Sequence, residues 1–521
     1  MPERCDVAIV GYGPTGQTLA ILLAQRGWRV TVLERWPTAY PMPRATHFDH
    51  AVGRIFQAAG VGDEVRSISD ACHSFAWRNR AGETLLEFGL MPQSRISGWP
   101  ASNMFHQPEL ERVLDRRARS LAVSVSRGFE VFDIEPGDGC VHVRARDASG
   151  RVRDVEARYA VGCDGANSFV RRWMRTPVED LGLAYDWLTV DLVTRSPRSW
   201  EPGNSMICDP RRPTAVSSGG PGRRRFEFMR LPRETLESLD DSSAAWQLLA
   251  PWGLSESDTI LERHSVYRSH ARWAESWRKG RVLLAGDAAH GMPPFVGEGF
   301  GSDLRDAATL AWKLDLVLAL RSPEELLDTY AQERLPHVRS LIDVSIQLGR
   351  MICMTDPREA AARDAQLIEL ARAGERTVIP TPPALGPGTT LAGDPNAGQL
   401  FPQGRVRLGS RGQSREGLFD DVVGRGWVLL GADGDPARAL GPEQRAFFTS
   451  LGGVGAHIGS GASLTDLDGR YERFFERGGA RVALVRPDFH VFGTAKDPAQ
   501  ASGLIDALAR ELASPTLAQE D

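Results

Sequence analysis

The residues from Arg281 to Lys313 have the types and spacing from which a cofactor site is built. The stretch begins with an apolar strand, breaks at Gly286-Asp287, passes through a loop rich in glycine and proline, and ends in a helical pattern. A carboxylate accepts hydrogen bonds from ligand hydroxyls, and a helix N-terminus favours a phosphate or an oxygen that gains negative charge. Taken alone, the stretch is also compatible with a loop that merely joins a strand to a helix.

A second chemical pattern stands near the start of the sequence. A buried strand pattern at 6–11 leads directly into Gly11-Tyr12-Gly13-Pro14-Thr15-Gly16, followed by a helix at 17–26, a strand at 28–33 and Glu34. In this context the first glycine makes the turn, the second admits a pyrophosphate, the third lets helix and strand pack closely, and the acid binds ribose hydroxyls. We therefore expect a dinucleotide site, although the pattern does not distinguish FAD from NAD. Its residues are Gly11, Gly13, Pro14, Thr15, Gly16, Glu34 and Arg35.

These motifs occur in an order that resembles a known family. The fingerprint comes first, Asp164-Gly165 follows in AVGCDGANSFVRR, and Gly286-Asp287 follows in LLAGDAAHGMPP. The chain resembles the class A flavoprotein monooxygenases of the para-hydroxybenzoate hydroxylase fold, over nearly its whole length. Residues 223–232, 293–299, 311–318, 326–337 and 486–493 are similar to the branch of 3-(3-hydroxyphenyl)propionate hydroxylase and the polyketide aromatic hydroxylases.

The resemblance implies an α/β fold with three parts. A Rossmann-type FAD-binding domain (1–75, 101–180 and 278–375) is interleaved with an antiparallel-sheet substrate domain (76–100 and 181–277). The stretch 376–403 is rich in proline and glycine and is predicted to be a linker. Residues 404–521 resemble the family's thioredoxin-like third domain. That part contains no cysteine, which excludes a dithiol redox role, so we expect packing or oligomerisation, as in a homodimer.

Composition sets limits on the partners. The 521 residues are 42% hydrophobic and 25% charged, with a formal net charge of −5, which gives no reason to expect nucleic acid. No apolar run approaches the roughly 18 residues of a membrane span, and no signal peptide pattern precedes the first strand. The six cysteines lack metal-site spacing, so we predict a cytoplasmic protein without a metal.

Further cofactor residues are implied by the resemblance. Arg44 is expected to reach the flavin or its phosphates, with a surface arginine at a helix start as the alternative. Gln107 is expected to contact the flavin, and the Asp164-Gly165 pair lies on the FAD side of the family's site. Asp287 is expected at the ribityl and pyrophosphate side. The remaining expected contacts are Gly299, Phe300 and Gly301.

The loop 293–301 is expected to face the flavin ring and to supply the catalytic positions. We predict Pro293, Gly297, Glu298 and Gly299 for this role, and no acid–base set is needed because the cofactor carries the chemistry. Glu298 and Asp303 depart from the usual pattern of the family. If both are ionised and point inward, they oppose flavin reduction; alternatively they point outward, with Asp303 in the first turn of the helix.

A strand-rich region between 181 and 277 is expected to cover the flavin and form the substrate wall. Candidate substrate contacts are Met206, Ser217, Phe228, Tyr267 and Pro294. The expected activity is hydroxylation of a phenolic or polyketide-type aromatic through a flavin C4a-hydroperoxide, using bound FAD, NADH or NADPH, and O₂. Two alternatives remain: Baeyer–Villiger oxidation or epoxidation of a polyketide by the same fold, and a flavin- or ligand-binding protein with impaired turnover.

Overall fold

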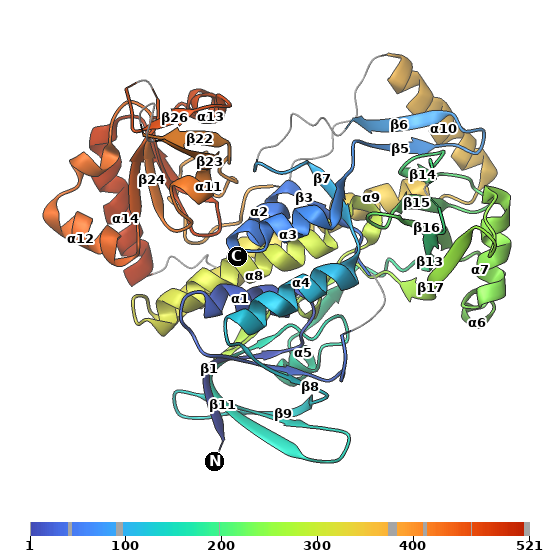
Figure 1. The fold of residues 1–521 in the computed structure, drawn as a ribbon, viewed down its shortest axis with the longest axis horizontal. Coiled ribbons are helices and arrows are strands. Elements are labelled where there is room, and N and C mark those ends of the chain that lie inside the picture. The colour runs from blue at the N-terminus through green and yellow to red at the C-terminus, as the bar shows by residue number, and fades with distance from the viewer. Residues whose placement is uncertain are drawn as a thin grey trace.

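A mostly parallel sheet organises the first part of the chain (Figure 1). The computed structural model describes residues 2–39, 44–89, 97–196, 198–373, 383–409, 414–459 and 461–514, so 376–382 of the predicted linker lie outside it. The strand order is β19 (Arg278–Lys279), β20 (Val282–Leu284), β11 (Val152–Gly162), β1 (Glu3–Val10), β2 (Val30–Glu34) and β8 (Ser124–Arg127). From β20 to β8 neighbouring strands run parallel, so their carboxyl ends share one edge.

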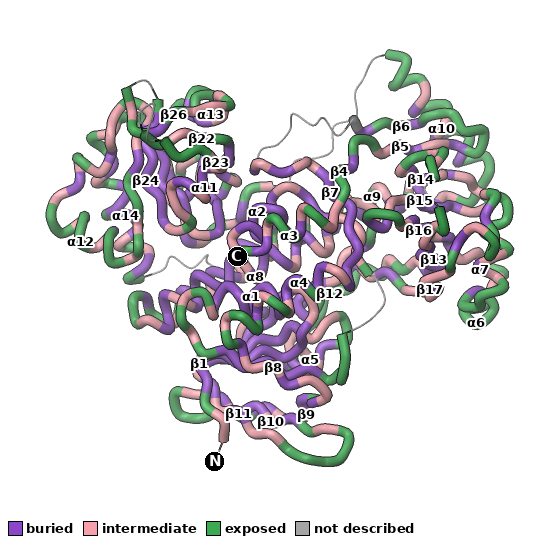
Figure 2. Tube along the Cα trace, in the orientation of Figure 1, coloured by how far each residue is buried: buried purple, intermediate pink, exposed green. Residues whose placement is uncertain are grey.

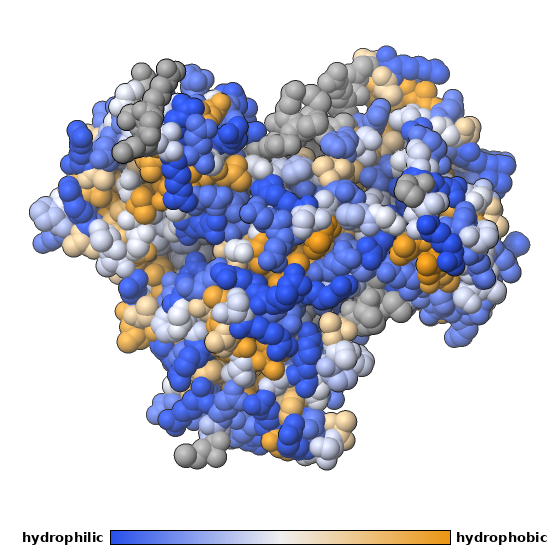
Figure 3. All heavy atoms as spheres, viewed as in Figure 1, coloured by the Kyte–Doolittle hydropathy of each residue, from blue (hydrophilic) through white to orange (hydrophobic). Residues whose placement is uncertain are grey.

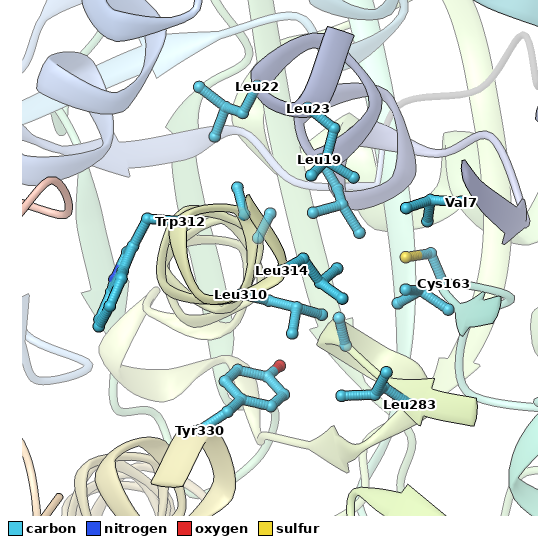
Figure 4. Packing of buried hydrophobic residues seen from close by; sticks show 14 of the residues in the cluster. Val7, Leu19, Leu22, Leu23, Cys163, Leu283, Leu310, Trp312, Leu314 and Tyr330 are labelled. Atoms are coloured by element: carbon cyan, nitrogen blue, oxygen red, sulfur yellow. The ribbon is translucent and has the colours of Figure 1, made fainter. Parts of the chain in front are cut away.

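Helices cover this sheet because its strands are apolar on both faces. The helices of this part are α1 (Pro14–Ala24), α2 (His50–Ala58), α3 (Gly62–Ser67), α4 (Gln107–Ser120), α5 (Phe169–Met174), α8 (Gly299–Leu318) and α9 (Asp328–Ile352). In Figure 4, Leu310 and Leu314 of α8 face the side of Leu283 and Cys163, whereas Trp312 lies on the other side of the helix. Each fully buried leucine contributes about 1.5–3 kcal/mol to folding.

Small strands extend this first part. β9 (Glu130–Pro136) and β10 (Val141–Arg146) continue from β11 as an antiparallel ribbon. Two three-stranded sheets complete it: β3 (His47–Asp49), β7 (Ser102–Phe105) and β4 (Ser69–Ala71), then β12 (Val178–Asp180), β18 (Arg272–Ala274) and β21 (His290–Gly291).

A seven-stranded sheet forms the second part, as the alternating patterns indicated. Its order is β17 (Thr259–Arg268), β13 (Asp186–Thr194), β16 (Arg223–Met229), β15 (Thr214–Ser218), β14 (Ser205–Ile207), β5 (Ser74–Arg78) and β6 (Thr84–Gly89). All neighbours are antiparallel except β14 and β5. One face packs against the short helices α6 (Leu236–Leu239) and α7 (Ser242–Leu249). The other packs against α9 and α10 (Pro357–Arg372).

The C-terminal part has the thioredoxin-like arrangement. Its sheet has the order β25 (Val454–His457), β24 (Val428–Gly431), β27 (Val482–Val485) and β28 (Val491–Ala495). β24 and β25 are parallel, while the other pairs are antiparallel. The helices are α11 (Phe419–Val422), α12 (Pro442–Ser450), α13 (Arg470–Gly478) and α14 (Ala501–Ala513). A second small sheet contains β23 (Arg415–Leu418), β22 (Arg405–Leu408) and β26 (Leu464–Asp466).

Burial follows these parts (Figure 2). Buried segments concentrate in the parallel sheet, in α1 and α8, and in the strands of the C-terminal part, while loops and outer helices are exposed. The face shown in Figure 3 is largely hydrophilic, with hydrophobic residues in scattered groups. No helix in the described ranges is long and apolar enough to cross a membrane.

Candidate active site

The three sequence motifs meet at the carboxyl edge of the parallel sheet. A Cβ atom added to Gly11 would lie 2.3 Å from the carbonyl oxygen of Cys163, so the fingerprint and the Asp164-Gly165 turn are in direct contact. A Cβ atom on Gly286 would lie 2.9 Å from Thr15 Oγ1 and 3.2 Å from Asp303 Cγ. Gly286 and Thr15, which are 271 positions apart in the sequence, therefore belong to one site, with the N-termini of α1 and α8 beside each other.

The fingerprint loop has the shape that a pyrophosphate requires. A Cβ atom on Gly16 would collide with the carbonyl of Gly11 at 2.3 Å, whereas the same position on Gly13 meets no atom within 4 Å. Gly13 is the N-cap of α1 and no side chain caps this helix, so its first N–H groups have no side-chain acceptor. An open glycine at an uncapped helix N-terminus fits a phosphate.

Glu34 lies at the end of β2, and backbone N–H groups fix its carboxylate. The N–H of Tyr12 donates to Oε2 at 2.7 Å, and the N–H of Trp36 donates to Oε1 at 2.9 Å. The first contact ties the acid to the fingerprint loop, where a ribose would lie. Arg35 is exposed and stands over the ring of Trp36.

Asp164 and Asp287 have different environments despite their similar motifs. Asp164 accepts from Ser168 Oγ and from the N–H groups of Phe169 and Val170, so its carboxylate caps the start of α5. Asp287 is exposed, whereas the other residues of the segment 282–290 are buried. Of the two acids, Asp287 is therefore the one whose carboxylate is available to a ligand.

Gln107 positions the segment that carries Arg44. Its Oε1 accepts from the N–H groups of Arg44 (3.2 Å) and Ala45 (2.8 Å), while its Nε2 donates to Glu111. The Arg44 side chain is exposed, and its carbonyl oxygen accepts a hydrogen bond from Arg225 of β16 at 2.5 Å. Gln107 is thus occupied with backbone groups in this structure, and Arg44 lies between the two parts of the site.

Two side chains hold the loop 293–301 in place. Ser345 of α9 donates to the carbonyl oxygen of Pro293 at 2.7 Å, and His47 Nδ1 lies 3.0 Å from the carbonyl oxygen of Gly297. Gly297 has φ +72°, which favours glycine, and a Cβ atom there would lie 3.2 Å from His47 Nδ1. Burial lowers the pKa of His47, so we expect a neutral imidazole beside the loop.

Glu298 points inward, and an arginine pairs with it. Its Oε2 lies 3.0 Å from Arg305 Nη1, and the same guanidinium contacts Asp49, the N-cap of α2. Burial, with a smaller effect from Asp49, raises the pKa of Glu298 to about 7 against the opposing effect of Arg305. Burial and the neighbouring Asp287 and Asp306 raise the pKa of Asp303 well above its ordinary value. Asp303 therefore favours the neutral form and Glu298 is neutral below about pH 7, which reduces their opposition to negative charge on a ring.

The first turn of α8 contributes backbone rather than side chains. The Phe300 ring packs into the core, with its centroid 5.1 Å from that of Phe105 and 6.4 Å from that of Phe56. A Cβ atom on Gly301 would lie 2.6 Å from Arg305 Nη1, so glycine is required for the ion pair to fit. No side chain caps α8, which leaves its first N–H groups to a ligand.

The predicted substrate contacts lie on two faces of the seven-stranded sheet. Met206 and Tyr267 belong to the cluster that faces α9 and α10, and Ser217 shares the face of Ala215 in that cluster. Phe228 lies on the opposite face, where it stacks on Phe226 with centroids 6.0 Å apart and packs near α7. This corrects the expectation for Phe228, because residues 226 and 228 point away from the side that meets Arg44. Pro294 is exposed.

Sequence reasoning missed a polar strip on the inner face. Arg225 donates to both oxygens of Asp191, at 2.7 and 3.0 Å, and Thr189 donates to Glu227 at 3.3 Å. Burial raises the pKa of Glu227, and burial with nearby Glu227 raises that of Tyr267 well above its ordinary value. Strand alternation in 223–229 contained the signal, since Arg225 and Glu227 alternate with phenylalanines.

Phe295 was also missed. Its ring lies 5.9 Å from that of Tyr185 and 6.0 Å from that of Trp187, which connects the loop 293–301 to the sheet. A Cβ atom on Gly349 of α9 would meet this ring at 2.4 Å. An aromatic side chain between two prolines and a glycine loop would have been the sequence signal.

Comparisons with known proteins agree with this site. The family of the FAD binding domain matches residues 4–345, and that of the HcaD C-terminal domain matches residues 398–511. A probable NADH-specific resorcinol 4-hydroxylase of Rhodococcus jostii (strain RHA1) is 39% identical over 518 residues, which cover 98% of this chain and 96% of the relative. The chain belongs to the FAD-dependent aromatic hydroxylases. FAD is therefore its cofactor and a reduced nicotinamide its co-substrate.

Further relatives of this hydroxylase extend the comparison. A 3-(3-hydroxy-phenyl)propionate/3-hydroxycinnamic acid hydroxylase of Comamonas testosteroni is 30% identical, over 98% of each chain. The crystal structure of the flavin-dependent monooxygenase PieE in complex with FAD and substrate superposes with a TM-score of 0.82 at 23% identity, over 98% of this chain and 100% of PieE. The ternary complex of aklavinone-11 hydroxylase with FAD and aklavinone has a TM-score of 0.77 at 25% identity, with the same coverage. The fold of the hydroxylase, including its C-terminal part, is thereby confirmed.

Proposed function

We propose that this hydroxylase acts on a neutral, one-ring phenol with a second hydroxyl group, of the resorcinol type, and takes its electrons from NADH. The observation that carries the proposal is the match to a resorcinol 4-hydroxylase along almost the whole of both chains. Polyketide substrates are not favoured, because only structural neighbours at 25% identity or less suggest them.

The charges on the inner face of the sheet support a neutral substrate. Arg225 is already bound by both oxygens of Asp191, and Arg263 lies 3.9 Å from the same carboxylate. Glu227 is half-buried on this face, beside Tyr267. A substrate carboxylate would approach a group of like charge, whereas a substrate hydroxyl can donate to Glu227.

The proposed roles of the chain's residues follow from their places. Gly13 and the start of α1 bind the pyrophosphate, Glu34 the ribose, and Asp287 and Arg44 the remaining polar parts of the cofactor. The loop 293–301 lies against its ring, with Glu298 held by Arg305. When bound and reduced, FAD activates O₂ and supplies the oxygen atom that enters the ring.

The substrate is proposed to lie between that loop and the sheet. Met206, Ser217, Tyr267 and Pro294 would line its place, Phe295 would exclude water, and Glu227 would accept the hydrogen bond of the second hydroxyl. This hydrogen bond draws electron density into the ring and fixes its orientation, both of which assist attack on an electrophilic oxygen. The domain limits, the cytoplasmic location and a homodimer also remain predictions.

Substrate-dependent oxidation of NADH tests the proposal. Resorcinol is expected to accelerate NADH oxidation at least tenfold more than 3-(3-hydroxyphenyl)propionate, with one atom of ¹⁸O₂ in the product. Glu227→Gln should raise the KM for resorcinol about tenfold, the effect of roughly 1.4 kcal/mol for a hydrogen bond to a charged group. FAD content should not change.

Two results would contradict the proposal. Faster turnover of the propionate than of resorcinol would assign a carboxylate substrate, and an unchanged KM in Glu227→Gln would remove Glu227 from the substrate site. Glu262→Gln is the matched control, since Glu262 pairs with Arg223 on the same sheet. Yellow protein that never oxidises NADH with any phenol would instead favour the binding protein with impaired turnover.

A further inference from the structure

A cavity of about 340 Å³ lies between the FAD-binding part and the C-terminal part. Three imidazoles line it, those of His50, His337 and His490, and Ile55, Leu400 and Phe489 provide apolar surface. It adjoins the flank of α8 that carries Arg305 and Thr309, away from Leu310 and Leu314, which face the sheet (Figure 4). The fingerprint glycines, Asp287 and the inner sheet face do not line it, so it is separate from the active site proposed above.

His337 has an unmet hydrogen-bonding group at this cavity. The residue is 2% exposed, and its Nδ1 has no hydrogen-bond partner among the described residues. Burial, with Arg334 and Arg305 nearby, lowers the pKa of His337 well below its ordinary value, so the imidazole is neutral. Buried polar atoms in native proteins nearly always have a partner, so this nitrogen has an unused capacity to bind a molecule in the cavity that His337 lines.

The charged groups of the lining are already paired, which excludes charged ligands. Arg305 is held by Asp49 and Glu298. Asp488 accepts from Arg486 and from Trp312 Nε1, the latter at 3.0 Å. The described residues also include no group of three side chains that could hold a metal ion. A charged ligand would lose its hydration without gaining a free counter-charge.

The remaining chemistry fits a flat, neutral molecule with a hydroxyl group. The Phe489 ring has the Arg54 guanidinium on one side, 4.2 Å from its centroid, and contributes aromatic surface to the cavity. A volume of about 340 Å³ is near the lower end for small-molecule sites and has room for one ring. We propose that this cavity is a second binding site for a neutral one-ring phenol, whose hydroxyl pairs with His337 Nδ1. The choice of phenol rests on the function proposed above.

Arg305 connects this site to the active site. Its side chain lines the cavity and at the same time holds Glu298 in the loop 293–301. A phenol in the cavity would therefore act on the loop through one side chain.

Equilibrium dialysis of resorcinol against the oxidised, FAD-loaded enzyme without nicotinamide tests the inference. The wild type should bind two equivalents. Ala308→Leu, which fills the cavity from α8, should bind one. Ala361→Leu is the control, because Ala361 is exposed on α10, and it should bind two. His337→Phe keeps an aromatic ring but removes the nitrogen, and it should weaken the second equivalent at least tenfold.

The outcomes separate this inference from the proposed function. If resorcinol is hydroxylated but the wild type and every variant bind only one equivalent, the inference of a second site is wrong. Water would then occupy the cavity. Two equivalents in Ala308→Leu would also overturn it, since the second site would then lie elsewhere. Two equivalents in the wild type, one in Ala308→Leu and no hydroxylation would support the site while the proposed function fails.

Discussion

At the scale of single residues, Glu298 explains how an acidic loop remains compatible with flavin chemistry. Burial raises its pKa to about 7 against the opposing effect of the paired Arg305, so Glu298 is neutral over part of the physiological range. Ionised Glu298 would oppose negative charge on the reduced ring. We expect Glu298→Gln to be reduced by NADH at the wild-type rate at pH 6 and severalfold faster than the wild type at pH 8, as measured by stopped-flow absorbance. If the variant and the wild type were reduced at equal rates at pH 8, the charge of Glu298 would have no effect on the flavin ring.

Protonation of Glu298 also affects the stability of the fold, and this effect can be measured without turnover. The folded-state pKa is raised from 4.5 to about 7, so the folded protein binds more protons between these values. Stability is therefore lost as pH rises through this range, by about 3 kcal/mol in total. In Glu298→Gln this contribution should be absent, and thermal unfolding between pH 5 and 8 should show a flatter dependence.

At the scale of elements, the N-termini of α1 and α8 form the proposed cofactor site. Gly13 is the N-cap of α1, and a methyl group added to it meets no protein atom within 4 Å. That methyl group would occupy the expected place of the pyrophosphate. We expect Gly13→Ala to fold normally and to lose FAD, with at least a tenfold fall in the ratio of flavin to protein absorbance. Gly503→Ala in α14, whose methyl group also meets nothing, should keep its FAD. Full occupancy in Gly13→Ala would contradict the assignment of this turn.

Local patterns could be predicted from the sequence at this scale, whereas contacts across the chain could not. Gly11, Gly13, Gly16 and Glu34 act within one strand–helix–strand unit, so their spacing sufficed. The pairing of Arg305 with Asp49 joins residues 256 positions apart, and no local pattern contains it. Phe228 was placed on the wrong face because alternation gives two faces without telling which one meets Arg44.

At the scale of the whole molecule, buried ion pairs join the C-terminal part to the FAD-binding part. Arg54 of α2 donates from Nε and Nη2 to Asp420, both at 2.7 Å, and from Nη1 to the carbonyl oxygen of Phe401. Arg486 donates to Glu333 of α9, which also binds Lys313 of α8. All of these side chains are almost fully buried. The C-terminal part is thus fixed to the helices behind the active site, consistent with a packing role.

Breaking one of these pairs should have a large cost. We expect Asp420→Ala to lower the free energy of unfolding by about 3–5 kcal/mol, because Arg54 stays buried without its partner. The control is Asp421→Ala. Asp421 lies next to Asp420 in α11, is half-exposed and pairs with Arg425, so its loss should cost at most about 1 kcal/mol. Thermal unfolding of the two variants measures the difference. Similar midpoints would mean that Arg54 finds another partner or reaches water.

The position of Asp488 has a consequence for the order of events during synthesis. Trp312 Nε1 and Thr309 Oγ1 of α8 donate to Asp488, and Glu333 of α9 receives from Arg486 one of its buried partners. Before residues 486–488 are synthesised, the nascent chain already contains the fingerprint and the whole of α8. At that stage Thr309 and Trp312 lack their acceptor Asp488, and Glu333 lacks its donor Arg486. Domains generally fold as units as they emerge, yet here the buried contacts of α8, the helix that begins at the loop 293–301, are completed by residues of the C-terminal part. Capture of FAD in its final geometry should accordingly follow the emergence of residues 486–488 from the ribosome.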